Sequence, residues 1–533
     1  MPKQNPGTNQ ELLDIEKKIA SLVARRSTLL SKISQQRQDK NKSFADPDLE
    51  KKLWQAWKKE FSSSNPSLMR QIFNLLNSLG YLQAERSLSD KPFSLYPSRK
   101  VLDLDFKGPL DQNLMHALAV MGVLSPGDIH LEGFTLNDQL LELTKIANEC
   151  GAGLSWREHA LTGRGLSSPN MDGHSLFIGN SRFNLYFFFC LGLASPSRIR
   201  FSGSALLKTL NLQDLQRLAP TLGARFSSIE PQSYTLPAKL ESSGTLPTEI
   251  RLPENMDTEF VRALVLASSV YPDPVSIFYP SRSDSDVRDC AQILSHFGIQ
   301  ADPEEQEHKI TIHPGSPVCK EQPQIPLDPL LSGFLLALAK PGKGRVKLAG
   351  CWPGQSELAC EIELLLRGCA LDLEISPDGI SSQDSDSPMQ TSFNLTRHPE
   401  LAPLIVPLAI TGQQEDTPLT FMLPQESLQL EAAADLLSLL GFDFSYISQG
   451  LRVKGPGKIP DKELSWTSPD PYWTLGCSII SFKYPGICLS NPGNLSSLWP
   501  EFWKIFTNLS PKKVHEKDEQ PPQPRKRIRI RKD

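Results

Sequence analysis

The chain has 533 residues, of which 39% are hydrophobic and 22% are charged, and its formal net charge is −4 at pH 7. This length suggests about three domains, and so small a net charge creates no field that would attract nucleic acid. No apolar run approaches the roughly 18 residues of a membrane span, and the polar N-terminus has no signal sequence, so we expect a cytoplasmic protein without nucleic-acid or membrane partners.

Residues 1–90 are predicted to form a separate helical domain. Thr8 and Glu11 can form a capping box at the start of a long helix. Apolar residues then recur at helical spacing, at Leu12, Ile15, Ile19, Leu22, Val23, Leu29, Leu30 and Ile33. Asp46-Pro47 and Asn65-Pro66 are typical starts of two shorter helices. Three such helices cannot bury their apolar stripes alone, so we expect a homodimer through this domain.

This helical arrangement resembles the all-helical chorismate mutase family, whose long first helix pairs with that of a second subunit. Arg26 falls on a motif arginine, Arg37 lies near the motif lysine, and Glu50 falls in the Asp-x-x-Arg-Glu segment that opens the second helix. Leu49 replaces the arginine of that segment. The resemblance implies a mutase-like remnant made of Arg26, Arg37 and Glu50. Since a mutase pocket stabilises a dianion with several cations, the lost arginine favours dimerisation over turnover.

Residues 91–107 are predicted to be a connector and a first strand that packs with the C-terminal half. Six copies of one pattern follow, each an apolar helical run, a turn and an alternating strand. The copies end at Gly133, Gly203, Pro280, Gly350, Leu423 and Asn491. These ends lie about 70 residues apart, a spacing that indicates internal repeats. A second helix in each of the first five copies is expected to end at a glycine, namely Gly151, Gly223, Gly298, Gly368 and Gly441.

Motifs for cofactors, metals and common hydrolases are absent from the sequence. There is no GxGxxG, GxxxxGK, HExxH or GxSxG pattern. The nine cysteines show no CxxC pairing, and the nine histidines are scattered singly. The cysteines are read as small core side chains in a reducing compartment. We therefore expect no metal and no cofactor.

The repeats and three short motifs resemble the enolpyruvyl transferase family and, within it, the 3-phosphoshikimate 1-carboxyvinyltransferases. The motifs are Ile178-Gly179-Asn180, His398-Pro399-Glu400-Leu401-Ala402 and Gln425-Glu426. The resemblance implies an α/β fold of six βαβαββ-type repeats, with half one at 108–317 and half two at 318–509 joined by a hinge. It also implies transfer of enolpyruvyl from phosphoenolpyruvate to shikimate-3-phosphate in chorismate and aromatic amino-acid biosynthesis.

The resemblance also implies a set of site residues. Glu400 and Glu426 take the positions of catalytic carboxylates. The substrate-binding positions fall on Asn180, Ser181, Arg182, Arg282 and Asp470. The Gly179-Asn180 turn is expected to hold a phosphate, because the backbone N–H groups at a helix start attract anions.

The family's seven substrate-binding cations are replaced here, by Leu110, Met115, Leu210, Gln425, Gln429, Tyr472 and Ser497. Asp257 and Glu259 add negative charge where a phosphate would lie, and Phe183 is expected to crowd a bound enolpyruvyl group. Two hypotheses follow. In the first, the chain is a divergent transferase that has rebuilt its anion sites, with Arg182 as the best replacement for the lost cations. In the second, it is a non-catalytic scaffold or regulator of aromatic-pathway enzymes.

Residues 510–533 form a separate C-terminal tail. It is poor in apolar residues and carries a basic run from Arg525 to Lys532. Such a composition predicts a disordered tail that stays solvated. A weak electrostatic site for anionic partners is the alternative.

Overall fold

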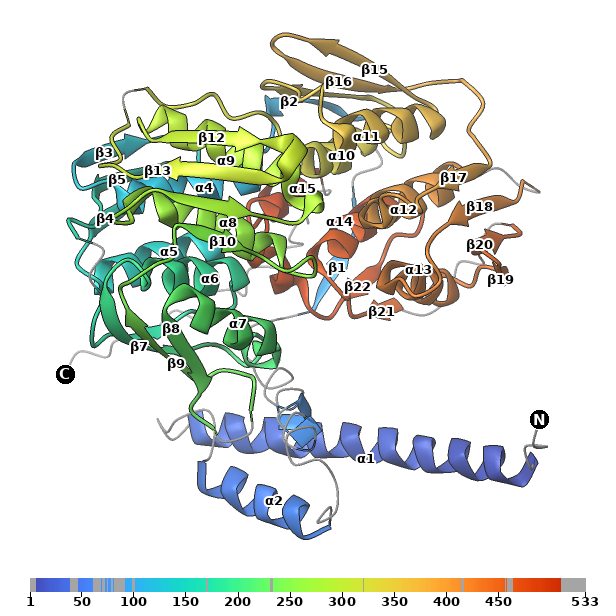
Figure 1. Ribbon diagram of the computed structural model, residues 1–533. Coiled ribbons are helices and arrows are strands. Elements are labelled where there is room, and N and C mark those ends of the chain that lie inside the picture. The colour runs from blue at the N-terminus through green and yellow to red at the C-terminus, as the bar shows by residue number, and fades with distance from the viewer. Residues whose placement is uncertain are drawn as a thin grey trace, which may run out of the picture.

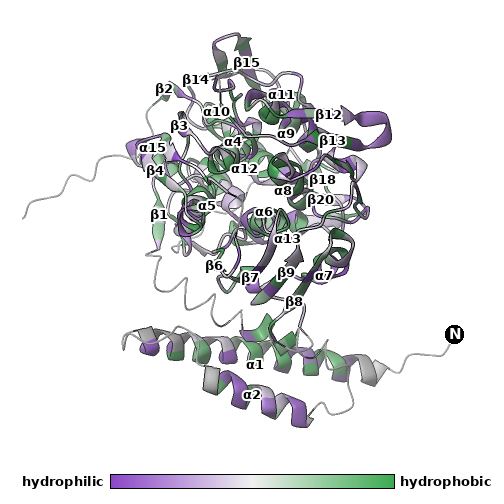
Figure 2. Ribbon diagram, turned by 60° about the vertical axis from the view of Figure 1, so that its left-hand side comes forward, coloured by the Kyte–Doolittle hydropathy of each residue, from purple (hydrophilic) through white to green (hydrophobic). Residues whose placement is uncertain are grey.

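The structure is a computed structural model that describes residues 6–38, 47–60, 69, 72–73, 75–77, 80, 92–97, 101–168, 171–230, 233–319, 321–413, 417–455, 457 and 464–509. In this part of the chain, helices and strands alternate to form two halves, with the N-terminal helices below them in both views (Figures 1 and 2). The predicted tail at 510–533 and the predicted helix start at Asn65-Pro66 lie outside the described residues.

Two helices open the chain, α1 (Pro6–Gln38) and α2 (Pro47–Glu60). The long helix confirms the apolar periodicity of this segment. It begins at Pro6, however, so the prediction that Thr8 caps its start was wrong. Proline is well tolerated in the first turn of a helix, where its missing N–H has no helical partner.

A small aromatic cluster joins these helices to the described residues between 69 and 80. Phe73 is 1% exposed, and its ring centroid lies 5.3 Å from that of Trp54 and 5.8 Å from that of Trp57. Leu30 of α1 is buried there too, and a side chain at Gly80 would collide with it. The C-terminal part of α1 therefore has an internal partner, whereas apolar residues of its N-terminal part are exposed.

Half one contains three units, each with its own sheet. The strand orders are β3-β5-β4, β6-β7-β9-β8 and β10-β11-β13-β12. Its elements are α4 (Gln112–Leu124), β3 (Asp128–Leu131), α5 (Asp138–Glu149), β4 (Gly153–Arg157), β5 (Ala160–Arg164), β6 (Ser175–Phe177), α6 (Arg182–Leu191), β7 (Pro196–Ser202), α7 (Gln213–Leu218), β8 (Ala224–Ser228), β9 (Ala238–Ser243), β10 (Glu249–Arg251), α8 (Thr258–Ala267), β11 (Val275–Phe278), α9 (Asp284–His296), β12 (Gln300–Glu304) and β13 (Lys309–His313).

Half two also contains three units, with strand orders β15-β16-β14-β2, β17-β18-β20-β19 and β1-β22-β21. Its elements are β1 (Phe93–Leu95), β2 (Asp103–Lys107), α10 (Pro329–Ala337), β14 (Arg345–Ala349), α11 (Glu357–Gly368), β15 (Leu371–Ser376), β16 (Gly379–Asp384), β17 (Ser392–Asn394), α12 (Ala402–Gly412), β18 (Leu419–Met422), α13 (Leu428–Leu439), β19 (Phe444–Ile447), β20 (Gly450–Val453), β21 (Leu464–Trp466), α14 (Pro471–Ile480), β22 (Ile487–Leu489) and α15 (Phe502–Leu509).

Two strands that precede half one in the sequence belong to sheets of half two. β2 pairs in parallel with β14, with Lys107 opposite Ala349, and β1 pairs antiparallel with β22. The chain therefore passes from half two into half one after β2, and it returns before α10. These two passages form the hinge between the halves.

The first helix of each unit lies inside its half and is covered by the sheets and by the second helices. These six inner helices are α4, α6, α8, α10, α12 and α14, and nearly every residue in them is buried. They contribute to two hydrophobic cores, one in each half. Figure 2 shows hydrophobic residues concentrated inside the two halves, while α1 and α2 carry both hydrophobic and hydrophilic residues. No helix among the described residues is long and apolar enough to span a membrane.

Left-handed residues end the second helix of five units. Gly151, Gly223, Gly298 and Gly441 have φ between 69° and 103°, as expected for glycines that follow a helix. In unit four the second helix also ends at its predicted glycine, Gly368, but the left-handed residue there is Ala370, with φ 59°.

Candidate functional site

The N-termini of the inner helices are capped by side chains of the chain itself. A side-chain oxygen accepts a backbone N–H of the first turn at 2.9 to 3.1 Å in five of the six. The caps are Asp111, Ser181, Asp257, Asp328 and Asp470. Free N–H groups and the helix dipole make such ends attractive to anions. At four of these ends the anion present is therefore an aspartate.

The hinge is built from a tripeptide that occurs twice, Pro109-Leu110-Asp111 and Pro326-Leu327-Asp328. Leu110 and Leu327 form an antiparallel bridge. The Asp111 N–H donates to the Pro326 carbonyl at 2.9 Å, and the Asp328 N–H donates to the Pro109 carbonyl at 2.8 Å. The two copies are thus bonded reciprocally, and each ends at the cap of an inner helix.

The two hinge carboxylates carry an electrostatic cost. Burial and, to a smaller extent, the nearby charge of Asp111 raise the pKa of Asp328 to about 7. Burial also raises the pKa of Asp111, which the guanidinium of Arg262 partly offsets. The pKa of Tyr472 is raised by burial and then by Asp328, so half two presents a phenol to this acidic junction. The junction of the halves is therefore acidic.

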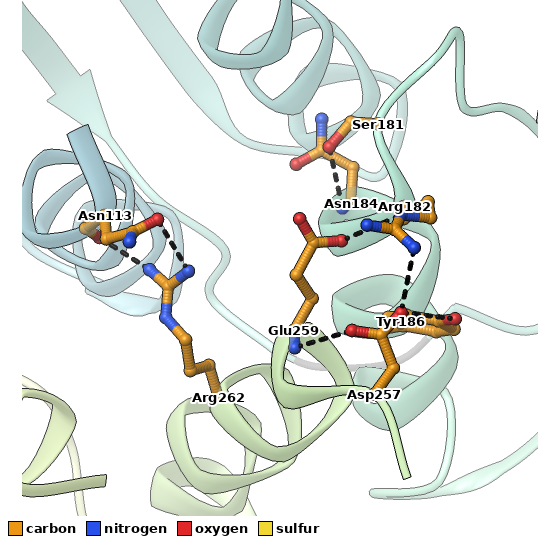
Figure 3. Close-up of polar contacts among 8 residues, drawn as sticks. All are labelled: Asn113, Ser181, Arg182, Asn184, Tyr186, Asp257, Glu259 and Arg262. Carbon is orange, nitrogen blue, oxygen red and sulfur yellow. Dashed lines mark hydrogen bonds and ion pairs between the residues drawn. The ribbon is translucent and has the colours of Figure 1, made fainter. Parts of the chain in front are cut away.

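Arg182, the predicted replacement cation, is the first residue of α6 and is half-exposed. Its guanidinium lies 3.2 Å from Asp257 and 3.4 Å from Glu259, two residues at the start of α8 (Figure 3). The Tyr186 hydroxyl also donates to Asp257, at 3.4 Å. Asp257 and Glu259 thus both face Arg182, and its charge is already paired.

Arg262 of α8 is a second cation in this region, and it is 6% exposed. It donates to the side chain of Asn113 at 2.9 Å and to the backbone carbonyl of the same residue at 2.7 Å (Figure 3). Asp286 lies 3.9 Å away. A buried arginine with these partners fastens α8 to the start of α4, so its donors are engaged.

The turn that was predicted to hold a phosphate receives a carboxylate instead. The Asn180 N–H donates to Oε2 of Glu142 at 3.3 Å, and a Cβ atom at Gly179 would lie 1.7 Å from the same carboxylate. Burial raises the pKa of Glu142 to about 7. The hydroxyl of Ser204 donates to the Asn180 side chain, and Ser181 caps α6. Glu142 therefore lies against the backbone where the sequence predicted an external anion.

Phe183 was predicted to crowd a bound enolpyruvyl group, but its side chain is buried and presents almost no surface to a ligand. It is 2% exposed and belongs to the core of half one. Its ring lies 4.5 Å from that of His116, and the guanidinium of Arg262 lies 5.2 Å from it. Arg282 is exposed, and its guanidinium donates to the Met256 carbonyl.

In half two, Glu400 lies in the short 3₁₀ turn Pro399–Leu401 before α12 and is exposed. Its carboxylate lies 2.9 Å from Nδ1 of His398. The opposite ring nitrogen of His398 is 3.5 Å from Glu357. Glu426 is exposed in the loop before α13, and no contact recorded among the described residues joins it to Glu400.

Gln425 and Gln429, which the sequence placed at positions of replaced cations, have structural partners. The side chain of Gln425 donates to the carbonyls of Ile447 and Ser448. Gln429 accepts the indole N–H of Trp473 at 2.6 Å and donates to Asp470 at 3.5 Å. Asp470, a predicted substrate residue, is therefore the cap of α14, and burial raises its pKa.

The mutase-like residues lie on the N-terminal helices. Arg26 of α1 donates to the Leu76 carbonyl at 2.7 Å and to the side chain of Asn77. Arg37 lies in the last turn of α1, and Glu50 lies in the first turn of α2. Among the described residues, no group of His, Cys, Asp or Glu is arranged to hold a metal ion.

No protein-family model matches the chain. It is 20% identical to 3-phosphoshikimate 1-carboxyvinyltransferase 2 of Halalkalibacterium halodurans, over 79% of this chain and 94% of the relative. A 3-phosphoshikimate 1-carboxyvinyltransferase of Rhodopseudomonas palustris is 25% identical to this chain, over 75% of this chain and 94% of the relative. An EPSP synthase structure from Acinetobacter baumannii superimposes with a TM-score of 0.63 at 17% identity, covering 79% of this chain and 98% of that one. The structure of the enolpyruvyl transferase NikO of Streptomyces tendae superimposes with a TM-score of 0.60 at 13% identity. The match covers 78% of this chain and 97% of that one.

The chain has the enolpyruvyl transferase fold. The fold class and the resemblance to 3-phosphoshikimate 1-carboxyvinyltransferases are thereby confirmed. The likeness of the first helices to chorismate mutases stays a prediction, as do the roles of Glu400, Glu426 and the substrate-binding residues.

Sequence reasoning missed two features of this enolpyruvyl transferase fold. The repeated Pro-Leu-Asp tripeptide was visible in the sequence, and its position before two inner helices was the signal for a paired hinge. The contact between Glu142 and Asn180 had no local signal, since 38 positions separate the partners. Only the packing of α5 against the start of α6 brings them together.

Proposed function

We propose that the chain acts at the step named by its curated relatives, the joining of enolpyruvyl from phosphoenolpyruvate to shikimate-3-phosphate in chorismate biosynthesis. The support is the extent of the likeness, which spans 94% of the length of the relatives from Halalkalibacterium halodurans and Rhodopseudomonas palustris. The role takes one of two forms, catalysis with rebuilt anion sites or a non-catalytic role that regulates aromatic-pathway enzymes.

The geometry favours the non-catalytic form. The observation that carries this choice is that the chain's own carboxylates occupy the helix ends, at Asp111, Asp257, Asp328 and Asp470, while Glu142 lies against Asn180. A hydrogen bond to a charged group contributes about 1.5–3 kcal/mol, so seven lost cations remove on the order of 10–20 kcal/mol of contacts. Micromolar binding amounts to only about 8 kcal/mol.

The catalytic form keeps one structural argument. Arg182 is half-exposed at the start of α6, and exposed ion pairs are weak, about 0–1 kcal/mol. A substrate phosphate could compete with Asp257 and Glu259 for its guanidinium. Catalysis would then depend on Arg182 more than on any other described cation near the helix ends.

Calorimetry with shikimate-3-phosphate separates the two forms, followed by an assay for phosphate release from phosphoenolpyruvate. We expect no binding heat at millimolar ligand and no phosphate release. Submicromolar binding that Arg182→Ala abolishes, and that Arg225→Ala on the outer strand β8 leaves intact, would instead establish a rebuilt site. The Arg225 variant controls for the loss of one positive charge in the same half.

We also propose that the chain forms a homodimer through α1. The supporting observation is a row of exposed apolar residues along this helix, Leu12, Ile15, Ile19, Leu22 and Leu29, whose side chains are 45% to 64% exposed. They are spaced three or four positions apart except for one gap, at Arg26, so they share one side of the helix. A second copy of α1 would cover them.

A further inference from the structure

A cavity of about 990 Å³ lies beside the hinge, away from the predicted substrate residues. Its walls come from both passages of the hinge, from the hairpin β4–β5 and the end of β3 in half one, and from the C-terminal segment of half two. The residues assigned to substrate binding or catalysis, from Asn180 to Asp470, do not line it. The cavity therefore offers a binding site separate from the helix ends.

The inner wall of this cavity is apolar. It includes Leu110 and Ile325 of the two hinge passages, Phe134 of half one, and Trp499 and Ile505 of half two. Phe134 and Trp499 are 1% and 3% exposed, so both rings are held by packing. Ligand pockets are typically apolar spaces of this size at domain interfaces, with a few polar groups that fix orientation.

Two cations stand at the rim of the cavity, one from each half. Lys107 ends β2 of half two, and Arg157 ends β4 of half one. Both are exposed, and neither has an ion pair or side-chain hydrogen bond among the contacts recorded for the described residues. A carboxylate placed between the two walls would meet positive charge from both halves.

Three glutamates also line the cavity, and two of them lie near histidines. Glu132 is 2.7 Å from a ring nitrogen of His130, and Glu501 is 4.0 Å from His159. Glu158 is exposed at the tip of the β4–β5 turn, with φ 53°. Three glutamates and two cations thus line the cavity, and Lys107 and Arg157 are the groups that can pair with an anionic ligand.

The two halves already touch around this cavity. The side chain of Gln322 exchanges two hydrogen bonds of 2.8 Å with the backbone of Glu132, which ties the second hinge passage to half one. Ser496 of half two donates to Asp138 of half one at 2.6 Å. A ligand in the cavity would add to these contacts and would hold the halves in the present arrangement.

We propose that this cavity binds a small organic carboxylate with an apolar, ring-sized body, and that the bound ligand restrains the hinge. The apolar body packs against the half-buried side chains of Leu110 and Ile505, and the carboxylate pairs with Lys107 and Arg157. The site does not rest on the proposed function, because the residues assigned to substrate binding or catalysis do not line it. Leu110, at one of the replaced cation positions, is the residue that the two regions share.

Calorimetry on the full chain with three probes tests the ligand class. Phenylacetate carries both the ring and the carboxylate, 2-phenylethanol lacks the charge, and acetate lacks the ring. We expect phenylacetate to bind at least about tenfold more tightly than either of the others, a difference of about 1.4 kcal/mol. Equal binding of phenylacetate and 2-phenylethanol, or no heat from phenylacetate at millimolar concentration, would overturn the proposal.

Variants locate the site. Lys107→Ala and Arg157→Ala should each weaken phenylacetate binding about tenfold, because each removes a charged donor. Arg164→Ala is the matched control, since Arg164 lies on the neighbouring strand β5, pairs with Asp128 and does not line the cavity. Amide hydrogen exchange at 107–110 and 322–325 should slow when phenylacetate is bound. Unchanged affinity in both cavity variants, or unchanged exchange at saturating probe, would contradict the assignment.

Discussion

At the level of single residues, the carboxylates at the inner helix ends have two opposed effects. As caps they stabilise their helices by roughly 1 kcal/mol each, because they accept N–H groups that have no helical partner. At the hinge, the same chemistry places Asp111 and Asp328 close together in a half-buried junction, where burial disfavours their charged forms. The N–H groups at the helix ends therefore have acceptors, but the burial of two neighbouring carboxylates destabilises the hinge.

This cost predicts a pH dependence. Because the pKa of Asp328 rises from 3.8 to about 7 on folding, the folded chain holds more protons than the unfolded chain between these values, and stability falls as pH rises through this window. Asp328→Asn keeps a good cap but removes the charge. We expect the variant to match the parent near pH 4 and to be more stable by about 1–4 kcal/mol at pH 8.

Thermal unfolding followed by circular dichroism at several pH values measures this difference. Asp103→Asn on the exposed strand β2 is the control, and it should leave the pH profile unchanged. A constant difference between Asp328→Asn and the parent from pH 4 to pH 8 would refute the electrostatic explanation. A variant less stable than the parent at pH 8 would show that the charge of Asp328 benefits its helix.

At the level of elements, the glycines that follow the second helices differ in how much space surrounds them. Gly223 and Gly298 are both left-handed, with φ 69° and 74°. A Cβ atom at Gly223 would lie 2.1 Å from the backbone carbonyl oxygen of Thr245, whereas a Cβ atom at Gly298 would meet nothing within 4 Å. We expect Gly298→Ala to cost about 1 kcal/mol, from conformation alone. Gly223→Ala should cost about 2–4 kcal/mol, since backbone must also move.

Chemical denaturation of both variants, with the transition of half one resolved, checks this ranking. The two substitutions control for each other, because they change the same residue type at equivalent positions of neighbouring units. Equal losses of stability would mean that the carbonyl of Thr245 moves away at no cost. A larger loss for Gly298→Ala would contradict the geometry.

The repeated elements could be predicted from the sequence because their signals are local. Apolar helical runs and alternating strands recur in every unit and closing glycines in the first five, and Gly151, Gly223, Gly298 and Gly441 behave as expected. The candidate site could be predicted only in part. Positions such as Asn180 and Asp470 were found by resemblance, but their present partners, Glu142 and Gln429, come from other elements. Only tertiary packing brings these partners together.

At the level of the whole molecule, two regions govern how large parts of the protein can associate: the hinge between the halves and the N-terminal helices. The halves meet at a hinge of two bonded passages, where acidic caps and a large cavity lie close to the same tripeptides. The N-terminal helices carry apolar residues that the rest of the described chain leaves exposed. An exposed row of this kind on a long helix is typical of a contact with another protein.

The dimer proposed through α1 makes the last prediction. Ile19 is 48% exposed in the middle of the apolar row, so Ile19→Glu would place two charges in a symmetric interface and should weaken the dimer at least tenfold, about 1.4 kcal/mol. Lys18→Glu changes the neighbouring exposed residue outside the row and should leave the dimer intact. Light scattering on the eluting protein distinguishes a 59.3 kDa monomer from a species of twice that mass. A monomeric parent at tens of micromolar, or loss of the dimer in both variants, would refute the assignment of the interface to this row.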